Sequence, residues 1–286
     1  MQTDQLVCSK FKGYHMKIII AILMLTVAIF AKQIPAYFVT KYQDENNISE
    51  KLSQSGFRVI GSYTPMENND YKVIAFTSKP LLELASKPRR GFAAVQKVLV
   101  DKQNKKLYWT NPEYFLSAFL QKEYDPSIAL DVRDIIHDRF EISELTEETM
   151  DEDDLGSYHF TFGMPYYEDM TVVGEKDNVL LNVAIQKHFS SNIVFKLELE
   201  SSTLYGISMF GQKGEGGFIP KINGLKNMAY LPYMVLVEDN QAKIMPAKYY
   251  MGLAFPNMGL GDFMSISGTP DDIKEYFEKA FEEENL

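Results

Sequence analysis

Two stretches of this chain, which begin 137 residues apart, repeat one order of residue types. They cover residues 98–119 and 235–255. Each has an apolar run that ends in an acidic residue, a polar turn, a second apolar run and a segment rich in aromatic residues. Two apolar runs joined by a polar turn are typical of a β-hairpin, and the segment after each hairpin is predicted to be a helix. We therefore expect two tandem copies of one α+β unit.

The repeat also sets expected boundaries. We take Lys102–Lys105 and Asp239–Ala242 as the two hairpin turns. A proline then opens each helix, since proline at the first helical position costs no hydrogen bond. These prolines are Pro112, which Asn111 can cap, and Pro246.

Weaker similarity upstream extends both halves to the order helix, two strands, helix, two strands, helix. The predicted elements of this part are 48–55, 57–63, 71–77 and 80–85 in the first half, and 177–189, 193–199, 204–210 and 219–227 in the second. The helix over 177–189 has one apolar face, formed by Val179, Leu180, Val183 and Ala184.

The segment between the halves combines a predicted helix with an acidic run. Residues 128–140 have apolar side chains at helical spacing. Residues 141–155 carry eight carboxylates and no basic residue, so their charges repel one another and we expect an exposed linker. A last helix over 270–284, with a capping box of Thr269 and Asp272, is expected to pack on the second half.

The hairpin followed by Asn111-Pro112, and Leu231-Pro232 before the run Tyr233–Glu238, resemble the domain of unknown function 302 family. Members of that family typically have an Asn-Pro helix start and a Leu-Pro before a strand with an acidic turn. Each half of this chain has one of the two features, and Tyr233 stands where a cysteine often follows. The resemblance implies two divergent tandem copies of a TATA-binding-protein-like domain, each an antiparallel sheet backed by helices. It implies no established activity.

This resemblance covers roughly residues 46–122 and 175–285. The predicted organisation is a signal peptide over 1–31, a first α+β repeat over 46–122, a helix and acidic linker over 123–156, and a second α+β repeat with a C-terminal helix over 157–286.

The N-terminus has the pattern of an export signal. Met16-Lys17 precedes 14 residues, Ile18–Ala31, that carry no charge. A membrane span needs about 20 such residues, so this length is typical of a secretory signal peptide cleaved after Ala31. An uncleaved anchor is the alternative. Met16 is the expected start of translation, and a long basic region before the apolar segment is the alternative for residues 1–15. We therefore expect a periplasmic or secreted protein that contacts a membrane only if the segment is retained.

Composition excludes several classes of function. The chain has 29 Lys and Arg against 39 Asp and Glu, a net charge of −10, whereas a nucleic-acid binder needs a basic face. One cysteine excludes an internal disulfide and a thiolate metal cage, and four scattered histidines offer little for a metal site. No metal and no cofactor are predicted.

Three local patterns have some of the residues of a binding or catalytic site. The loop Gly211–Gly217 lacks the residues of a phosphate loop and is predicted to be a flexible connection. A calcium loop aligned on Gly156 puts Leu155 and Phe162 at ligand positions, so a solvated linker is favoured. His137 lies between Asp134 and Asp138 on one predicted helix, a pattern more typical of a solvated surface than of a metal or base site. No catalytic residue is assigned.

Large aromatic and methionine side chains are in excess, with 17 Tyr, 19 Phe and 14 Met. These side chains fill cores, but they also line apolar pockets, where tyrosine adds a hydrogen bond. The candidate ligand-pocket residues are Trp109, Tyr114, His159, Tyr166, Tyr230, Tyr233 and Tyr250.

The preferred hypothesis is an exported, non-enzymatic protein that binds a small apolar ligand or an envelope protein. The alternatives are an envelope enzyme that uses carboxylate acid–base chemistry, and a module whose halves pair sheet to sheet. An apolar pocket without titratable groups would favour binding, and a buried carboxylate beside a histidine in a pocket would favour the enzyme.

Overall fold

The first of two large sheets is antiparallel and six-stranded. The computed structural model describes residues 32–282, so the predicted signal peptide lies outside the described residues. In spatial order the strands are β3 (Arg58–Tyr63), β4 (Tyr71–Thr77), β5 (Gln96–Asp101), β6 (Lys106–Thr110), β2 (Tyr37–Lys41) and β7 (Glu144–Leu145). The described residues from Gln33 onward belong to one unit that contains this sheet and the second.

The second large sheet is antiparallel and five-stranded. In spatial order its strands are β10 (Ile193–Glu198), β11 (Thr203–Ile207), β12 (Tyr233–Glu238), β13 (Gln241–Ile244) and β9 (Thr171–Glu175). A small third sheet pairs β1 (Gln33–Pro35) with β8 (Thr149–Asp151). The predicted α+β class with antiparallel sheets is thus confirmed.

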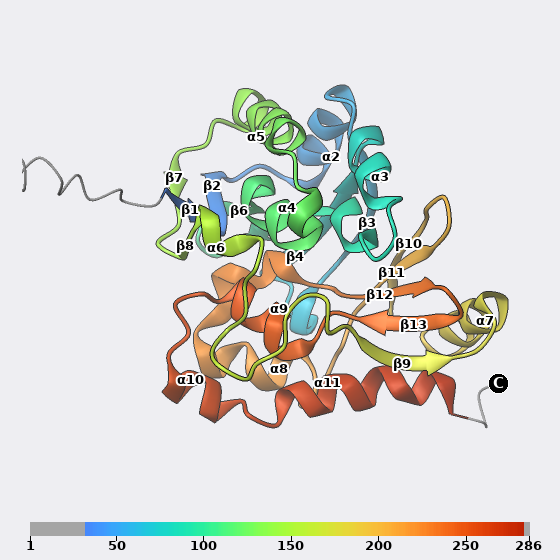
Figure 1. Cartoon of the computed structure of the whole chain (residues 1–286). Coiled ribbons are helices and arrows are strands. Elements are labelled where there is room, and N and C mark those ends of the chain that lie inside the picture. Colours follow the sequence, from blue (N-terminus) through green and yellow to red (C-terminus); the bar gives the residue numbers. More distant parts are fainter. Residues whose placement is uncertain (1–31, 283–286) are drawn as a thin grey trace, which may run out of the picture. The chain divides into compact units, whose positions relative to one another are not determined.

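Helices back both large sheets. The α-helices are α2 (Glu45–Gln54), α3 (Lys79–Ala85), α4 (Pro112–Leu120), α5 (Pro126–Phe140), α6 (Glu152–Leu155), α7 (Asn178–His188), α8 (Glu215–Phe218), α9 (Ala247–Ala254), α10 (Leu260–Ser265) and α11 (Thr269–Glu278). The 3-10 turns are η1 (Pro65–Glu67), η2 (Gly91–Ala94), η3 (Gln121–Glu123), η4 (Pro220–Ile222), η5 (Gly224–Tyr230) and η6 (Lys279–Phe281). In Figure 1, α2, α3 and α5 lie at the top, over the first sheet, and α11 runs along the bottom, under the second.

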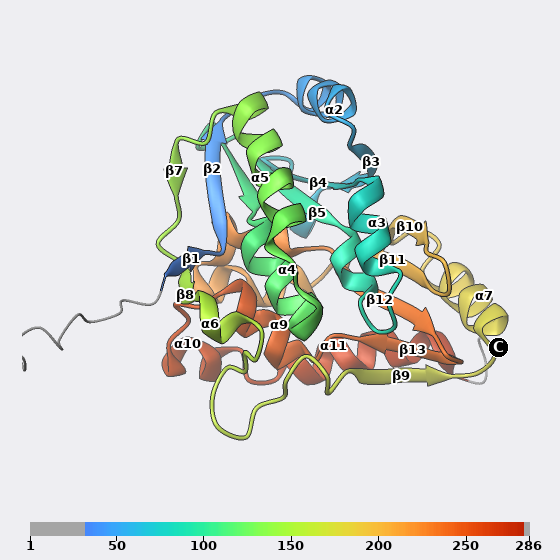
Figure 2. The same cartoon turned by 45° about the horizontal axis from the view of Figure 1, so that its top comes forward.

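Five strands of the first sheet, from β3 to β2, have the same order as the five strands of the second sheet, and β7 is an additional strand beside β2. In each sheet two hairpins lie side by side, and a strand that precedes the first helix pairs with the last hairpin strand. These preceding strands, β2 and β9, are absent from the sequence prediction, although the aromatic and β-branched residues of 37–40 favour a strand. Figure 2 shows β2 along one side of the molecule and β9 along another.

The half that contains the six-stranded sheet packs against the half that contains the five-stranded sheet, and we call their contact region the seam. The turn η5 of the second half packs against β5 and β6, and η2 of the first half packs against β11 and β12. The helices α4 and α9 exchange hydrogen bonds: the Tyr114 hydroxyl donates to the Leu253 carbonyl at 2.9 Å, and the Tyr249 hydroxyl donates to the Ala118 carbonyl at 3.0 Å. The buried apolar side chains consequently form one cluster that runs through both halves.

The predicted register of the repeat is wrong after the second hairpin. Its turn contains only Asp239 and Asn240, both with left-handed backbone angles, because β12 and β13 already pair at Glu238 and Gln241. Two-residue turns of this kind match the twist of a hairpin. Helix α9 begins one residue later than predicted: Ala247 is its first residue, and Pro246 is the residue before it.

The predicted apolar face of the helix over 177–189 is wrong for three of its four residues, and Ala184 alone of the four is buried as predicted. Helix α7 buries Leu181, Ala184 and Ile185. The side chains of Val179, Leu180 and Val183 are 69%, 51% and 56% exposed. This helix has two apolar stripes. The stripe that packs against β12, β13 and η6 is buried, and it is not the one predicted from periodicity.

Two further predictions need correction. The predicted central helix over 219–227 consists of the 3-10 turns η4 and η5. The acidic run is not a wholly exposed linker, since it supplies β7, β8 and α6, and Glu148 within it is only 6% exposed. The C-terminal helix is confirmed over Thr269–Glu278, with Gly268 at its cap in place of the predicted capping box.

Candidate functional site

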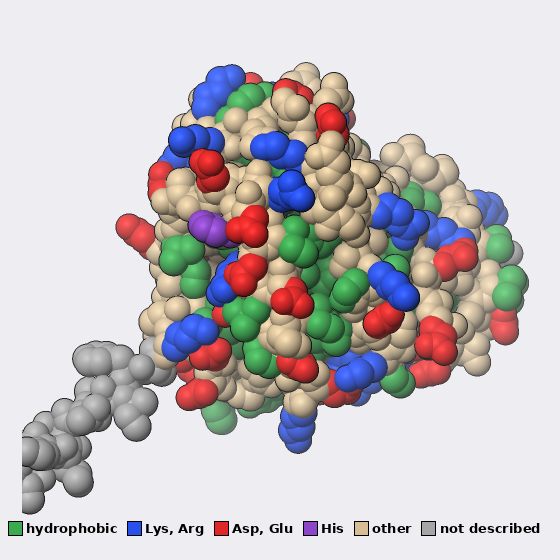
Figure 3. Space-filling view, turned by 90° about the horizontal axis from the view of Figure 1, so that it is seen from above, with side chains coloured by type: hydrophobic (Ala, Val, Ile, Leu, Met, Phe, Trp, Pro, Cys, Tyr) green, Lys and Arg blue, Asp and Glu red, His purple; other side chains and the backbone are tan. Residues whose placement is uncertain are grey.

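A mostly apolar cavity of about 270 Å³ lies where α5 meets the starts of β3 and α3. Phe57, Pro80, Ile128, Val132 and Ile135 give it apolar walls. They come from three elements: Phe57 follows the turn that ends α2, Pro80 lies in the first turn of α3, and the other three form one stripe of α5. Figure 3 looks onto the face that carries α5, α2 and α3, where hydrophobic side chains reach the surface among interspersed charges.

One polar group in this cavity has no partner. The Ser78 side chain lines the wall, and its Oγ is buried without a hydrogen bond among the described residues. Ser78 is the N-cap residue of α3, but its side chain forms no capping hydrogen bond. A buried hydroxyl without a partner costs free energy.

A second cavity, of about 250 Å³, is polar. It lies between the Glu147-Glu148 segment, the η4–η5 turns and the connection from α9 to α10. Glu148 forms an ion pair with Lys226 at 2.7 Å through Oε1, while its Oε2 is buried without a hydrogen-bond partner among the described residues.

Two other hollows hold histidines. His137 lines one together with Asp134, whose side chain is 62% exposed and paired with Arg133. His159 lines the other with Asp154, and its ring contacts that of Tyr166 at a tilt of 40°, with the ring centroids 4.5 Å apart. Neither hollow places a buried carboxylate beside its histidine.

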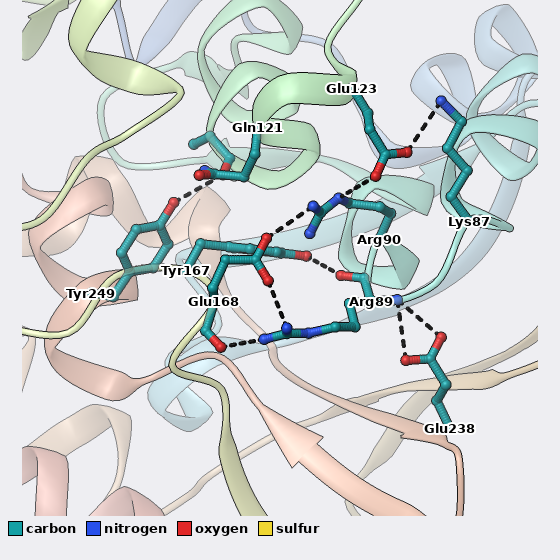
Figure 4. Close-up of polar contacts among 10 residues, drawn as sticks. Lys87, Arg89, Arg90, Gln121, Glu123, Tyr167, Glu168, Glu238 and Tyr249 are labelled. Carbon is teal, nitrogen blue, oxygen red and sulfur yellow. Dashed lines mark hydrogen bonds and ion pairs between the residues drawn. The ribbon is translucent and has the colours of Figure 1, made fainter.

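A polar cluster fastens the seam between the halves (Figure 4). The Arg89 backbone N–H donates to both carboxylate oxygens of Glu238 on β12, at 3.0 and 3.1 Å. The Arg89 guanidinium forms an ion pair with Glu168 at 2.8 Å. The Tyr167 hydroxyl donates to the Arg89 carbonyl at 2.5 Å. The turn that contains Arg89, in the first half, is thus bound both by residues 167–168 and by β12 of the second half.

Arg90 extends this cluster inward. It is 8% exposed, contacts Glu168 at 2.9 Å and Glu123 at 3.5 Å, and lies over the Tyr167 ring. Lys87 also pairs with Glu123. The contacts of Arg89 and Arg90 with Glu168 therefore join the two halves, and those with Glu123 lie within the first half.

Two titratable groups are buried near the seam. Burial raises the pKa of Glu215 to about 7, although the Tyr63 hydroxyl and the backbone N–H groups of Met66 and Met209 all donate to it. Burial lowers the pKa of Lys97 to about 7. Glu215 joins the glycine loop to the first half, which corrects the prediction that this loop is a flexible connection.

The Lys97 ammonium lies among the aromatic side chains predicted from sequence. Its Nζ donates to the Tyr230 carbonyl at 2.5 Å and the Tyr250 hydroxyl at 3.0 Å. Tyr230, Tyr233 and Tyr250 contact one another edge to face, and the hydroxyls of Tyr230 and Tyr233 have no partner among the described residues. Burial raises the pKa of all three tyrosines, so their hydroxyls stay protonated.

The remaining predicted pocket residues lie elsewhere. Trp109 is in the core of the first half against Phe140, and Tyr114 is in α4 at the seam. His159 and Tyr166 lie together near the surface. The structure therefore brings together three of the seven predicted residues in one core cluster and two in another place.

The sequence patterns did not identify the residues that line the apolar cavity beside α5 or the polar cavity around Glu148. Ser78 and Ile128 belong to elements distant in sequence, and Glu148 is one of eight carboxylates in an acidic run. Only the buried position distinguishes Glu148 from its neighbours, and sequence pattern does not show it.

Comparison with protein-family models, with curated proteins and with solved structures found no match. Among residues 32–282, no helix has the length and apolar character needed to cross a bilayer, and no group of three or more acidic, histidine or cysteine side chains is arranged to hold a metal ion.

Proposed function

We propose that this chain is a binding protein whose small apolar ligand occupies the cavity between α5, β3 and α3. The observation that carries this proposal is an apolar wall with a single buried, unpartnered hydroxyl, that of Ser78. Ligand sites commonly combine apolar walls with a few polar groups that fix orientation. Asp131, the titratable side chain in the lining, is exposed at the rim.

The cavity selects by size and by one hydrogen bond. Its volume of about 270 Å³ lies just below the usual range for small-molecule sites, roughly 300–1,000 Å³. The ligand is thus a compact ring or short chain with one hydroxyl or carbonyl group that reaches Ser78.

The test uses p-cresol and toluene as probes, which differ by one hydroxyl. Methyl NMR of Ile128 and Val132 reports occupancy of the cavity. We expect both probes to shift these methyl signals, with p-cresol binding more tightly to the wild type and the two binding equally to Ser78→Ala. Unshifted methyl signals with both probes would contradict the proposal.

A filling variant and a matched control locate the site. Ile135→Trp places an indole in the cavity and is expected to abolish binding of both probes. Val183→Trp makes a bulky substitution on an exposed position of α7 and is expected to leave binding unchanged.

We further propose that the protein is exported, with a signal peptide over 1–31, and that its halves are divergent tandem copies of one TATA-binding-protein-like domain. The shared strand order and the reciprocal α4–α9 hydrogen bonds support the duplication. The uncharged segment Ile18–Ala31 supports export. Mass spectrometry of the protein from its own cells tests cleavage after Ala31.

A second candidate function is docking of an envelope protein on α7. The exposed stripe of Val179, Leu180 and Val183 supports it, since contiguous exposed apolar side chains mark interaction surfaces. A photo-crosslinker at position 180 in living cells is expected to give one discrete adduct, and the same group at Glu50 on α2 is expected to give none. Equal crosslinking from both positions would contradict docking.

Enzymatic carboxylate chemistry, the alternative expected from sequence, is less well supported. Glu215 has the raised pKa of a general acid, but protein groups occupy its carboxylate. The histidines that line cavities have exposed carboxylate neighbours.

A further inference from the structure

We propose that the polar cavity around Glu148 binds a small alkylammonium ion. This site is separate from the apolar cavity, and it shares no lining residue with it. Glu148 offers a carboxylate oxygen that the protein leaves unused: Oε1 is paired with Lys226, whereas Oε2 is buried without a partner among the described residues.

The charge of the lining selects a cation. Glu147, Glu148 and Asp262 contribute three carboxylates against the single ammonium of Lys226. A buried carboxylate oxygen without a partner is costly, and a charge-assisted hydrogen bond from an N⁺–H group satisfies it best. An anionic ligand would meet repulsion at this site.

The rest of the lining favours an organic ammonium ion. Phe255 and Met258 provide apolar surface for a short alkyl stem, and the Phe255 ring can contact a cation. The Asn227 side chain forms part of one wall, and it is held there by a hydrogen bond in which its Nδ2 donates to the Ala254 carbonyl at 3.0 Å. With about 250 Å³ available, a compact amine of a few carbon atoms fits.

Three probes separate charge from hydrogen bonding. n-Butylamine carries charge and N–H donors, tetramethylammonium carries charge alone, and n-butanol has a similar shape without charge. Calorimetric titration of the purified protein is expected to show n-butylamine binding at least about tenfold more tightly than either control, the ratio that one charge-assisted hydrogen bond supplies. Equal affinity for the three probes, or no binding of n-butylamine at about 10 mM, would overturn the proposal.

Variants assign the binding to Glu148. Glu148→Gln is expected to lose at least about tenfold in affinity for n-butylamine, because the amide lacks the charge. Glu144→Gln, on β7 with its side chain 56% exposed, is the matched control and should bind as the wild type does. Binding to Glu148→Gln at wild-type affinity would remove Glu148 from the site.

Chemical rescue gives an independent measurement if Glu148→Gln folds poorly. Lys226→Met leaves the Glu148 carboxylate without its ammonium partner, which should lower the thermal midpoint. We expect n-butylamine to raise the midpoint of Lys226→Met more than that of the wild type or of Lys221→Met, an exposed neighbour on η4 outside the cavity. n-Butanol should raise none of them. Equal effects of n-butylamine on all three proteins would contradict an ammonium site at Glu148.

Discussion

Burial controls the charge of two side chains at the seam. Burial raises the pKa of Glu215 and lowers that of Lys97, and both reach about 7. Glu215 receives three protein donors, and Lys97 donates to a carbonyl and a hydroxyl but to no carboxylate. Hydrogen bonds satisfy these groups only in part, because each charged form still loses its hydration.

Lys97→Met should stabilise the protein at neutral pH. Between pH 7 and about 10.5 the unfolded chain binds more protons at this residue than the folded chain, so stability from Lys97 rises with pH. At pH 7 and below, the cost is on the order of a few kcal/mol, at ~1.4 kcal/mol per pKa unit. Tyr250 still donates to the Tyr230 carbonyl in the variant. Urea denaturation from pH 6 to 10 should show higher stability at pH 7 and a smaller slope; an unchanged slope would contradict this role.

Glu215→Gln should remove a pH dependence of opposite sign. Between about 4.5 and 7 the folded chain holds the proton that the unfolded chain has lost, so stability from Glu215 falls as pH rises. The neutral amide abolishes this slope, and Tyr63 can turn its hydroxyl to accept from the new amide group. Urea denaturation at pH 5, 6 and 7 measures the slope. A variant that retains the wild-type slope would show that another group titrates.

At the scale of secondary-structure elements, hydrogen bonds between α4 and α9 join the two halves. Helices α4 and α9 each supply a tyrosine at their third residue and a carbonyl acceptor at their seventh. The two bonds are reciprocal because the elements around them have the same order in both halves.

Removing these hydroxyls should cost unequal amounts. Tyr114→Phe leaves the Leu253 carbonyl without this donor and should lower the free energy of unfolding by about 1 kcal/mol. Tyr249→Phe should cost less, since Gln121 also donates to the Ala118 carbonyl. Tyr166→Phe, on a ring 46% exposed, is the control and should change stability by less than about 0.5 kcal/mol. Thermal and urea denaturation would measure the order, and a larger loss in Tyr249→Phe would contradict it.

Elements with a strong local signal were predictable from sequence, and contacts between distant elements were not. The helix over 128–140 and the strand over 71–77 follow from periodicity, and α5 and β4 lie close to those bounds. The buried face of α7 was not predictable, because the choice between its two apolar stripes depends on β12 and η6. The same limit applies to Ser78 and Glu148, whose burial depends on neighbours far away in the chain.

At the scale of the whole molecule, the two sheets meet where β3 and β10 approach. Gly61 on β3 lies so close to Val194 that an added Cβ would be 2.1 Å from the Val194 carbonyl oxygen. No side chain fits at that position without a shift of the backbone. The close approach of β3 to β10 thus depends on a residue without a side chain at position 61.

Gly61→Ala should therefore destabilise the whole molecule. Overpacking of this kind costs typically about 1–3 kcal/mol, and here backbone rather than a flexible side chain must move. Gly156→Ala is the matched control, because its Cβ would meet nothing within 4 Å and its backbone is right-handed helical. Hydrogen exchange should show faster exchange in both β3 and β10 for Gly61→Ala. Faster exchange in β3 alone would show that the halves do not depend on this contact.

Native mass spectrometry of the protein purified from its own cells tests the central claim, the binding of a small apolar ligand, most directly. We predict a reproducible added mass that disappears on denaturation and is absent from Ile135→Trp but present in Val183→Trp. A bare chain under gentle conditions, or an added mass that Ile135→Trp retains, would contradict ligand binding in the cavity between α5, β3 and α3.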